Sequence, residues 1–544
     1  MLKRGRFGPA AVTVAVALWL ATLGNAALWR ELAQLGLLQG WRGAGFALAL
    51  VLIVTSALVL LVAPLAWRWT LKPLLTLLLL AGAAGAHFML SYHVVIDTPM
   101  ITNVLQTDPR EAGDLLTLRW AGTMALLGLL PAWAVWRTPL ALGRWPQRLG
   151  RNLVLALAAL AVLVGAVLVV FQPLSANMRN HKQLRYLINP LNSLYALGDL
   201  AAEPFKRDSR VLAALGTDAR LQPPPGAQRP PLLLLVLGET GRAGNFGLNG
   251  YGRDTTPELA RLPVISWRNA WSCGTSTAAS VPCMFSHLGR AGFDGRKTEH
   301  ETLLDVAQHA GLAVLWLDNQ SGCKGVCDRV PSASTTALKD PVLCADGECW
   351  DEILLKDLDQ RIAALPAERR ARGVLLVMHQ MGSHGPAYYK RVPPAFKRFM
   401  PECATSVLQD CRREQVVNAY DNTIAYTDHV LAGAIAWLGT QAPRFDAAML
   451  YLADHGESLG ENNLYLHGLP YALAPDVQKR VPWISWLSPG FAQRQHLSAD
   501  CLRGRADAEV SHDHLFHSTL GMLEVRTSAY QPALDAYAPC RAPG

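Results

Sequence analysis

Long apolar segments dominate the first third of the chain and alternate with short charged stretches. Each segment is about as long as an α-helix that crosses a bilayer, at roughly 1.5 Å per residue. Buried helices of a water-soluble core would have polar faces, and five apolar segments in succession leave none. The fourth segment is the shortest and contains Pro131, so its helix is expected to begin near Leu115. The pattern predicts a five-helix transmembrane domain over residues 1–178, with spans at 8–29, 43–67, 73–96, 120–136 and 152–178.

The flanks of these segments carry unequal numbers of positive charges. One set of flanks has lysine or arginine at positions 3, 4, 6, 68, 72, 137, 144, 148 and 151, and the other has only Arg30, Arg42, Arg110 and Arg119. Basic flanks stay in the cytoplasm, so five spans place the rest of the chain on the opposite side of the membrane. This topology explains much of the formal net charge of +8, and no nucleic-acid partner is needed to account for it.

The second part of the chain has the alternating pattern of an α/β domain. A polar stretch at 179–230, which ends near Pro225, predicts an amphipathic connector over the membrane surface and then a stiff linker. From residue 231 onward, short apolar runs alternate with stretches of helical spacing, which predicts a largely parallel sheet. A run at 480–486 contains Pro482 and is therefore expected to be an edge strand. Buried strands are expected at 231–237, 311–317, 373–378 and 447–452.

Residues with metal-binding and acid–base chemistry follow the ends of these runs. Glu239 follows the first run, His379 follows the third, and Asp454 and His455 follow the fourth. Because open α/β sheets bind ligands at the carboxyl ends of their strands, these side chains are expected to meet in one crevice. An Asp–His pair alone is more often a helix cap or a surface pair, but the matching groups at the other strand ends favour a functional site. Carboxylate oxygens and imidazole nitrogens suit zinc.

Cysteines occur only in the second part of the chain. All ten lie after residue 272, which indicates disulfides formed in an oxidising compartment. A zinc site shared by the first four cysteines after residue 320 is an alternative, although no paired histidines follow at zinc-finger spacing. The spacing favours the pairs Cys273–Cys283, Cys323–Cys327, Cys344–Cys349, Cys403–Cys411 and, over a longer loop, Cys501–Cys540.

A segment rich in hydroxyl groups lies between two of these cysteines, at residues 272–283. Its composition predicts a turn that leads into a helix, where free N–H groups and the helix dipole favour a bound phosphate. A metal beside such a hydroxyl would stabilise its alkoxide. The simpler interpretation is that these residues only cap a helix. The residues alone do not separate Thr275, Ser276, Thr277 and Ser280.

Several long motifs, in order along the chain, resemble those of the lipid A phosphoethanolamine transferases, which include the mobile colistin resistance enzymes and their chromosomal relatives. The similarity covers nearly the whole chain and includes the five-span half. It implies an alkaline-phosphatase/sulfatase-like catalytic domain over residues 231–544, which lies in the periplasm while the spans lie in the bacterial inner membrane. The motifs are Gly238 to Thr240, Cys273 to Ser286, His379 to Tyr388, Asp454 to Asn462, and Met100 to Val104 together with Glu111.

The resemblance also implies roles for single residues. Thr277 matches the nucleophile, and it also matches a zinc ligand together with Glu239, Asp454 and His455. A second zinc, or the transferred phosphoryl group, would bind near His384 and His467. Lys324 matches a position that contacts the substrate. Asn103 and Glu111 match positions that hold the head group of the donor.

The activity implied is transfer of phosphoethanolamine from phosphatidylethanolamine to a lipid A phosphate through a phosphoethanolamine ester of Thr277. Added ethanolamine reduces the negative charge of the cell surface and thereby weakens polymyxin binding. We expect a membrane-embedded monomer. Alternatives are a transferase that acts on a core sugar of lipopolysaccharide, a hydrolase of the phosphodiesterase or sulfatase type, and a non-catalytic sensor. Sulfatases need a C/S-x-P-x-R context that the Thr277 segment lacks, and the retained set of ligands argues against a sensor.

The remaining histidines have simpler interpretations. His379 is expected to support the site rather than to bind metal. The group that includes His512, His514 and His517 looks like a metal site, but helix capping and supporting hydrogen bonds are the favoured interpretation.

Overall fold

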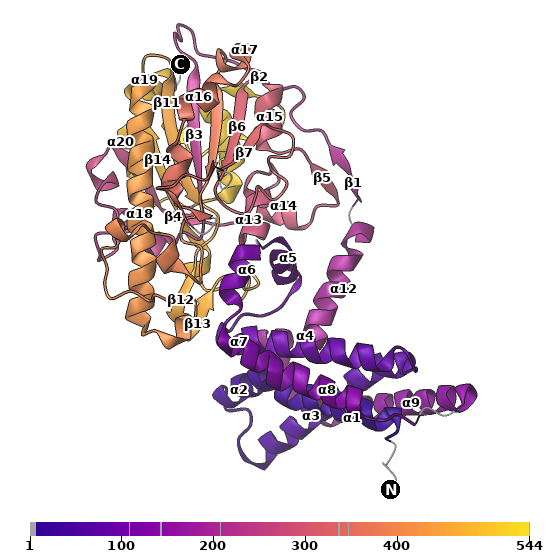
Figure 1. Ribbon diagram of the computed structural model, residues 1–544. Coiled ribbons are helices and arrows are strands. Elements are labelled where there is room, and N and C mark those ends of the chain that lie inside the picture. The colour runs from indigo at the N-terminus through magenta and orange to yellow at the C-terminus, as the bar shows by residue number, and fades with distance from the viewer. Residues whose placement is uncertain are drawn as a thin grey trace. The chain divides into compact units, whose positions relative to one another are not determined.

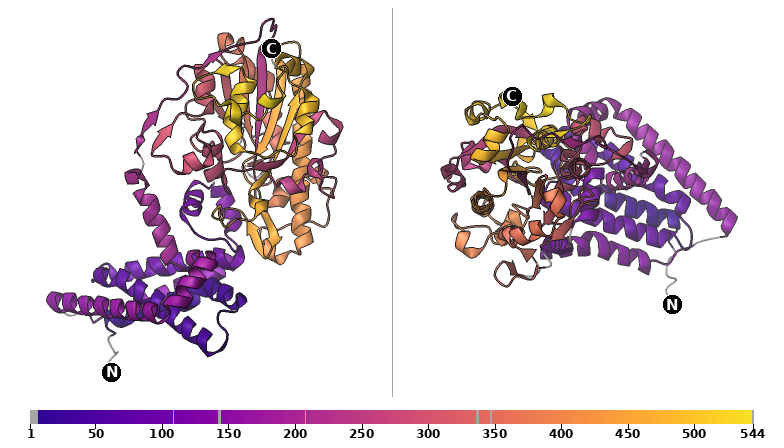
Figure 2. Two further views of the ribbon diagram at one scale, coloured as in Figure 1. Left: turned by 180° about the vertical axis from the view of Figure 1, so that it is seen from behind. Right: turned by 90° about the horizontal axis from the view of Figure 1, so that it is seen from above.

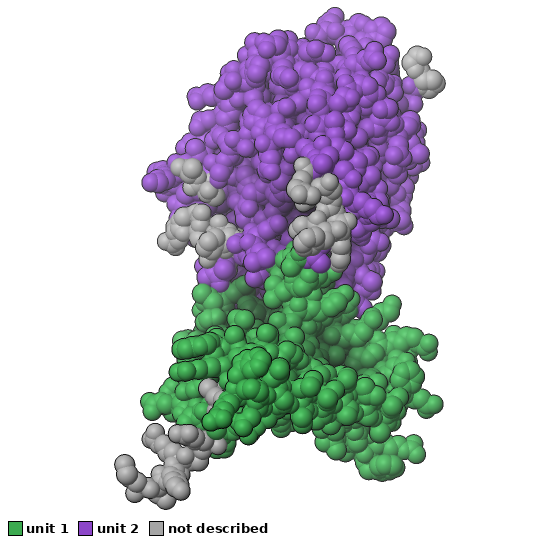
Figure 3. All heavy atoms as spheres, turned by 90° about the vertical axis from the view of Figure 1, so that its right-hand side faces the viewer, with its two compact units in different colours: residues 1–101, 115–201 green, residues 102–114, 202–544 purple. Residues whose placement is uncertain are grey.

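The computed structural model describes residues 7–107, 109–141, 144–206, 208–335, 338–345 and 348–542. The chain divides into two compact units, shown in separate colours in Figure 3. The first unit comprises Met1–Ile101 and Leu115–Ala201, and the second comprises Thr102–Asp114 and Ala202–Gly544. The second unit therefore includes a short segment from between the third and fourth apolar helices.

The first unit contains five helical segments that are long and apolar enough to cross a membrane, as the sequence predicts. The fourth begins at Leu118 rather than near Leu115, because Thr117 caps it by accepting a hydrogen bond from the N–H of Trp120. The fifth ends at Val169, well before residue 178, since the backbone leaves helical geometry at Val170 and a separate helix follows. The segments are Pro9–Gln34, Gly40–Leu65, Leu71–Ser91, Leu118–Arg137 and Trp145–Val169. Their α-helices are α1 (Pro9–Thr22), α2 (Ala26–Gln34), α3 (Gly40–Val62), α4 (Leu71–Ser91), α7 (Leu118–Thr123), α8 (Leu130–Arg137) and α9 (Trp145–Val169).

The fourth span contains a wider helical turn just before its proline. Residues Met124–Leu129 form a π-helix, after which α8 begins at Leu130 with Pro131 in its first turn. Pro131 has no N–H to donate to the carbonyl four residues earlier, that of Leu127. The indole N–H of Trp19 in α1 donates to this carbonyl instead, at 3.2 Å. A side chain from another span thus satisfies a backbone group for which the bilayer offers no partner.

The second unit is built on an eight-stranded sheet. Its strand order is β15-β4-β14-β11-β3-β10-β6-β7. Figure 1 shows the sheet, with strands β4, β14, β11, β3, β6 and β7 labelled. The ladders are parallel except where β14 (Arg480–Leu487) pairs with β4 and β11. The other strands are β3 (Pro231–Gly238), β4 (Val264–Trp271), β6 (Ala313–Asp318), β7 (Ser332–Ser334), β10 (Val374–His379), β11 (Asp446–Ala453) and β15 (Val510–Ser511).

The expectation that Pro482 marks an edge strand is wrong. Strand β14 lies inside the sheet, between β4 and β11. The pairing of β14 with β4 shifts register between Val481 and Trp483, so Pro482 occupies an irregularity of the ladder. A residue without an N–H is tolerated in an interior strand at such a bulge.

The register of β3 with β10 and β11 aligns the ends of these three strands, which the candidate site residues follow. Gly238 of β3 pairs with Ala453 of β11, and Leu237 pairs with His379 of β10. All eight residues of β3 are buried, so both faces of the sheet are covered. One face packs in a core with helices α15 (Leu303–His309) and α21 (Leu515–Met522), and α18 (Arg413–Thr440) runs alongside the sheet, as Figures 1 and 2 show.

Disulfides join all ten cysteines in the five pairs expected from their spacing. The alternative of a cysteine zinc site at Cys323, Cys327, Cys344 and Cys349 is therefore wrong, because these sulfurs are not free thiolates. After the fifth span comes α10 (Phe171–Asn180), which extends into the polar stretch. The rest of that stretch contains α11 (Gln183–Tyr186), α12 (Leu191–Lys206), β1 (Asp208–Ala213) and β2 (Arg220–Leu221).

The Trp19 hydrogen bond can be tested by its removal. We expect Trp19→Phe to destabilise the first unit by about 1 kcal/mol, because the Leu127 carbonyl loses this side-chain donor in an apolar environment. The measurement is thermal unfolding of the full chain in detergent, with Trp133→Phe as the control because Trp133 is 56 % exposed. Equal effects of the two substitutions would contradict this role for Trp19.

Candidate active site

Four side chains meet where β3 and β11 end and helix α13 (Thr277–Met284) begins. Glu239 follows β3, Asp454 and His455 follow β11, and Thr277 is the first residue of α13. The hydroxyl oxygen of Thr277 lies 3.1 Å from both carboxylate oxygens of Glu239 and 3.4 Å from His455 Nε2. His455 Nε2 lies 3.3 Å from Asp454 Oδ2 and 3.4 Å from Glu239 Oε1. The structure thus brings together four residues from three distant segments of the sequence.

A backbone contact sets the orientation and tautomer of the His455 ring. Its Nδ1 lies 2.9 Å from the carbonyl oxygen of Gly456, so Nδ1 carries a proton and donates it. Nε2, on the other side of the ring, faces the carboxylates of Glu239 and Asp454. A neutral imidazole held in this way presents the Nε2 lone pair to a metal ion.

The two carboxylates and the imidazole have shifted pKa values. Burial and the charge of Glu239 raise the pKa of Asp454 to about 6. Burial would lower the pKa of His455, but the Asp454 charge and a hydrogen bond to Glu239 raise it to about 9. Burial would raise the pKa of Glu239, but its hydrogen bond with His455 and the nearby histidine charges lower it. Two buried carboxylates therefore hold a positive charge between them, carried by a proton or by a metal ion.

The donor set fits zinc. One ligand atom from each of Glu239, Asp454 and His455 lies within 4.8 Å of the others, and all three residues are buried. Among the described residues, Asp454 Oδ2 has no hydrogen-bond partner, although it is buried. A buried oxygen without a donor is costly unless an ion or water satisfies it. Two carboxylates, one imidazole and the adjacent Thr277 hydroxyl form the oxygen and nitrogen set that zinc accepts.

Two residues that the sequence did not assign hold Glu239 in place. Thr240 Oγ1 donates to Glu239 Oε1 at 2.7 Å, and Gln320 Nε2 donates to Glu239 Oε2 at 3.1 Å. Gln320 lies in the loop after β6, and its position in the sequence does not reveal that its partner is Glu239.

His379 supports the site rather than joining the cluster of ligands. Its Nδ1 lies 3.1 Å from Asp318 Oδ2, to which the indole of Trp316 also donates at 2.8 Å. Its Nε2 lies 3.9 Å from Glu239 Oε2. Burial would lower the pKa of His379, but the bond to Asp318 raises it. The raised pKa favours a positively charged His379 ring next to the Glu239 carboxylate.

His384 and His467 lie beside the cluster. The His467 ring centroid is 4.2 Å from that of His455, and the His384 centroid is 5.9 Å from that of His467. The buried carboxylate of Glu457 lies 3.4 Å from His467 Nδ1, so it orients this ring. Glu457 was not singled out from the sequence, although it stands only two residues after His455.

Asp351 is a second buried carboxylate that no motif revealed. It accepts hydrogen bonds from Asn319 Nδ2 and from the N–H groups of Met381 and Gly382, each at 2.8 Å. These bonds connect the loops that follow β6 and β10. Gly382 has φ +54, and a Cβ there would lie 2.6 Å from the Glu239 carbonyl oxygen, so glycine is required for this close approach. Asp351 therefore fixes the loops around Glu239 without touching the ligands.

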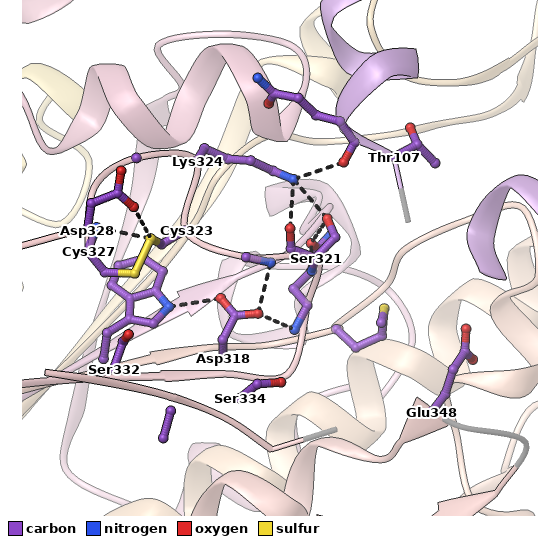
Figure 4. Close-up of a pocket in the computed structure, with 17 residues that line it drawn as sticks. Thr107, Asp318, Ser321, Cys323, Lys324, Cys327, Asp328, Ser332, Ser334 and Glu348 are labelled. Atoms are coloured by element: carbon purple, nitrogen blue, oxygen red, sulfur yellow. Dashed lines mark hydrogen bonds between the residues drawn. A yellow bond between two sulfur atoms is a disulfide. The ribbon is translucent and has the colours of Figure 1, made fainter. Parts of the chain in front are cut away.

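A cavity of about 630 Å³ lies beside Gln320, which donates to Glu239, and is shown in Figure 4. It is lined by Asp318, Gln320 and the loop that carries Lys324, and by Gln106 and Thr107 from the segment 102–114. Lys324 Nζ donates to Ser321 O at 3.1 Å, to Ser321 Oγ at 2.9 Å and to Gln106 O at 3.4 Å. The cavity is large enough for a lipid head group.

Asn103 and Glu111 are the residues of segment 102–114 that are expected to bind the head group. Unlike Lys324, neither is among the described residues that line the cavity. Asn103 lies in α5 (Thr98–Gln106), and it is not among the described residues that line the cavity. The side chain of Glu111 lies outside the described residues. Thr107, which was not singled out, lines the cavity and donates to the Asn103 carbonyl at 2.7 Å.

Comparison with known proteins gives two family matches along the chain. Residues 231–525 match the model described as "Sulfatase", and residues 54–205 match the model described as "Phosphoethanolamine transferase EptA/EptB". The structure is similar to the integral membrane lipooligosaccharide phosphoethanolamine transferase A (EptA) from Neisseria meningitidis. That match has a TM-score of 0.93 at 34 % identity and covers 99 % of this chain and 100 % of the other.

Curated relatives agree with these matches. The chain is 39 % identical to phosphoethanolamine transferase EptA of Escherichia coli K12 over 99 % of its own length and 98 % of that protein. It is 37 % identical to phosphatidylethanolamine transferase Mcr-1 of Escherichia coli, over 89 % of its own length and 90 % of the relative. These similarities extend across both compact units. The chain therefore belongs to the phosphoethanolamine transferase family of EptA and Mcr-1.

Proposed function

We propose that this protein transfers phosphoethanolamine from phosphatidylethanolamine to a phosphate of lipid A through a phosphoethanolamine ester of Thr277. The observation that carries this proposal is the Thr277 hydroxyl, which stands at the start of α13 within 3.1 Å of the Glu239 carboxylate and beside His455. The hydroxyls of Thr275 and Ser280 bond elsewhere in the chain, to the Leu469 carbonyl and the Gly274 N–H. The relatives phosphoethanolamine transferase EptA and phosphatidylethanolamine transferase Mcr-1 support the identity of the transferred group and of the donor.

In the first step, Thr277 Oγ1 attacks the phosphorus of the donor. The hydroxyl donates to Glu239, so its proton points to the carboxylate and a lone pair remains for the attack. The Oγ1–P bond forms, the P–O bond to glycerol breaks, and diacylglycerol leaves with a proton. A zinc ion bound by Glu239, Asp454 and His455 would supply the positive charge that lowers the pKa of a neighbouring hydroxyl.

In the second step, an oxygen of the acceptor phosphate attacks the same phosphorus. The new O–P bond to the acceptor forms as the Oγ1–P bond breaks, and the proton released by the acceptor phosphate returns Thr277 to its hydroxyl form. Negative charge grows on the non-bridging oxygens in both steps, and His384, His467 and Lys324 offset it from fixed positions. Thr277 is the first residue of α13, where the helix dipole favours the same negative charge.

We further propose that the chain is anchored in the bacterial inner membrane with its catalytic unit in the periplasm. Basic flanks on one side of five spans support this orientation, as do five disulfides, which form in an oxidising compartment. Donor and acceptor are both lipids, so an anchored enzyme searches for them in two dimensions. Each transfer adds an ammonium group to lipid A, which would weaken the binding of cationic peptides such as polymyxin.

Lipid A from a bacterium that expresses the chain tests the overall function. We expect mass spectrometry to detect lipid A with added phosphoethanolamine and the phosphate position to be resolved by fragmentation. Cells with Thr277→Ala should show only unmodified lipid A. Modification of a core sugar instead would identify that sugar as the acceptor. Free phosphoethanolamine with unmodified lipid A would indicate a hydrolase.

The covalent step is tested without an acceptor. Incubation with phosphatidylethanolamine should place phosphoethanolamine on the peptide that contains Thr277 and release diacylglycerol, both measured by mass spectrometry. Thr277→Ser should retain part of this reaction because a hydroxyl stays at the same position. Ser276→Ala is the matched control, since the Ser276 side chain makes no capping hydrogen bond. An adduct on another residue would contradict the assignment of Thr277.

Metal binding should depend on pH because zinc displaces the proton of His455. The pKa of this ring is about 9 without metal, so about one proton should be released per zinc at pH 7 to 8, and affinity should rise with pH. Below about pH 6, protonation of Asp454 should weaken binding further. Isothermal titration calorimetry in buffers of different ionisation enthalpy measures this release. Asp454→Asn and His455→Ala should lose tight binding while they remain folded, and unchanged affinity in both would refute the site.

A further inference from the structure

A buried imidazole, His512, connects the loop that carries Thr277 to the end of the strand that carries Asp454. The N–H of Cys273 donates to His512 Nδ1 at 3.0 Å, and His512 Nε2 lies 2.9 Å from the carbonyl oxygen of Ala453. Cys273 stands four residues before Thr277, and Ala453 immediately precedes Asp454. We propose that His512 is a positioning residue that holds the Thr277 hydroxyl in register with the carboxylates of the site. This proposal rests on the function of Thr277 proposed above.

The hydrogen bonds determine the tautomer of His512. Because Nδ1 accepts from a backbone N–H, it carries no proton, and the proton must lie on Nε2, which donates to Ala453 O. Burial lowers the pKa of His512 to about 3, so the ring stays neutral. A neutral ring satisfies one backbone donor and one backbone acceptor without adding charge next to the carboxylates. Its side chain is fully buried, so water cannot replace either bond.

Sheet topology explains why a side chain is needed at this place. Strand β15 pairs with β4, with Val510 opposite Ala270 and Ser511 opposite Trp271. His512 is therefore the first residue beyond β15, next to the point where β4 ends and the Thr277 loop begins. Strands β4 and β11 are not neighbours, because β14 lies between them. Backbone ladders cannot join their two ends directly, whereas the imidazole reaches both.

Other bonds hold the loop from different sides but do not reach Asp454. Ser272 N donates to the Lys479 carbonyl at 2.7 Å, and Thr275 Oγ1 donates to the Leu469 carbonyl at 2.6 Å. The disulfide Cys273–Cys283 closes the loop onto α13. Among the described contacts of this loop, the His512 bridge is the one that ends at the backbone of β11. Its loss should leave the loop folded but displaced relative to Asp454.

The test uses full-length protein in detergent, with phosphatidylethanolamine as donor. A displacement of about 1 Å at an attacking atom can cost on the order of a hundredfold in rate, so we expect His512→Ala to lower kcat by about ten- to a hundredfold. The KM for the donor should change by less than about threefold, because the donor cavity is untouched. Zinc content, measured by mass spectrometry, should remain that of the unmodified chain.

Two isosteric variants separate the contacts of His512. Asparagine can place an acceptor near the position of Nδ1, and glutamine can place a donor near that of Nε2. Because Thr277 lies on the loop of Cys273, His512→Asn should retain several-fold more adduct formation than His512→Gln. This comparison remains informative if the alanine variant does not fold.

The matched control is His517→Ala. His517 is equally buried and also accepts a backbone N–H, that of Gln531 at 3.1 Å, but it belongs to α21 and contacts none of the four site residues. We expect a lower unfolding temperature with unchanged kcat. Equal kcat losses in His512→Ala and His517→Ala, or equal adduct formation in His512→Asn and His512→Gln, would overturn the proposal. Absence of transfer by the unmodified chain would instead refute the function on which it rests.

Discussion

Two buried carboxylates, Glu239 and Asp454, lie close together in the site, and the site is organised around their repulsion. The register of β3 with β11 makes their proximity unavoidable, since each follows one member of the pair Gly238 and Ala453. Like charges in a region of low dielectric require a cation between them. A protonated His455 or a metal ion can satisfy this requirement, and in the proposed mechanism the same positive charge would activate the Thr277 hydroxyl beside it. The repulsion between Glu239 and Asp454 thus favours the bound positive charge that the proposed reaction would use.

The histidines of this unit illustrate how a hydrogen-bond partner determines the role of one side chain. His455 donates to a backbone carbonyl, which leaves a neutral nitrogen for a metal. His379 bonds to the Asp318 carboxylate, which raises its pKa and favours a charged ring behind Glu239. His512 bonds to the backbone on both sides and stays neutral. The three rings differ in partner rather than in depth, because each is fully buried.

Much of the fold and part of the site could be predicted from the sequence, because strand ends and apolar lengths are local signals. Glu239, Asp454 and His455 each follow an apolar run that forms a buried strand. The choice of Thr277 among neighbouring hydroxyls depends on which one meets Glu239 across the fold, and no spacing encodes that contact. Asp351 and Gln320 were missed for the same reason, since their partners lie on other loops. Pro482 was misplaced because the sequence does not reveal a bulge inside a sheet.

The segment 102–114 gives the catalytic unit an unusual connectivity. It leaves the first unit after Ile101 and rejoins it at Leu115, so the two units are linked by the chain at three points rather than one. Within the second unit it contributes Gln106 and Thr107 to the cavity wall, and Asp114 pairs with Lys390. A soluble fragment that starts after Ala201 would keep the metal ligands but lack this wall. Measurements on such a fragment would therefore report on the candidate metal site but not on binding in the complete cavity.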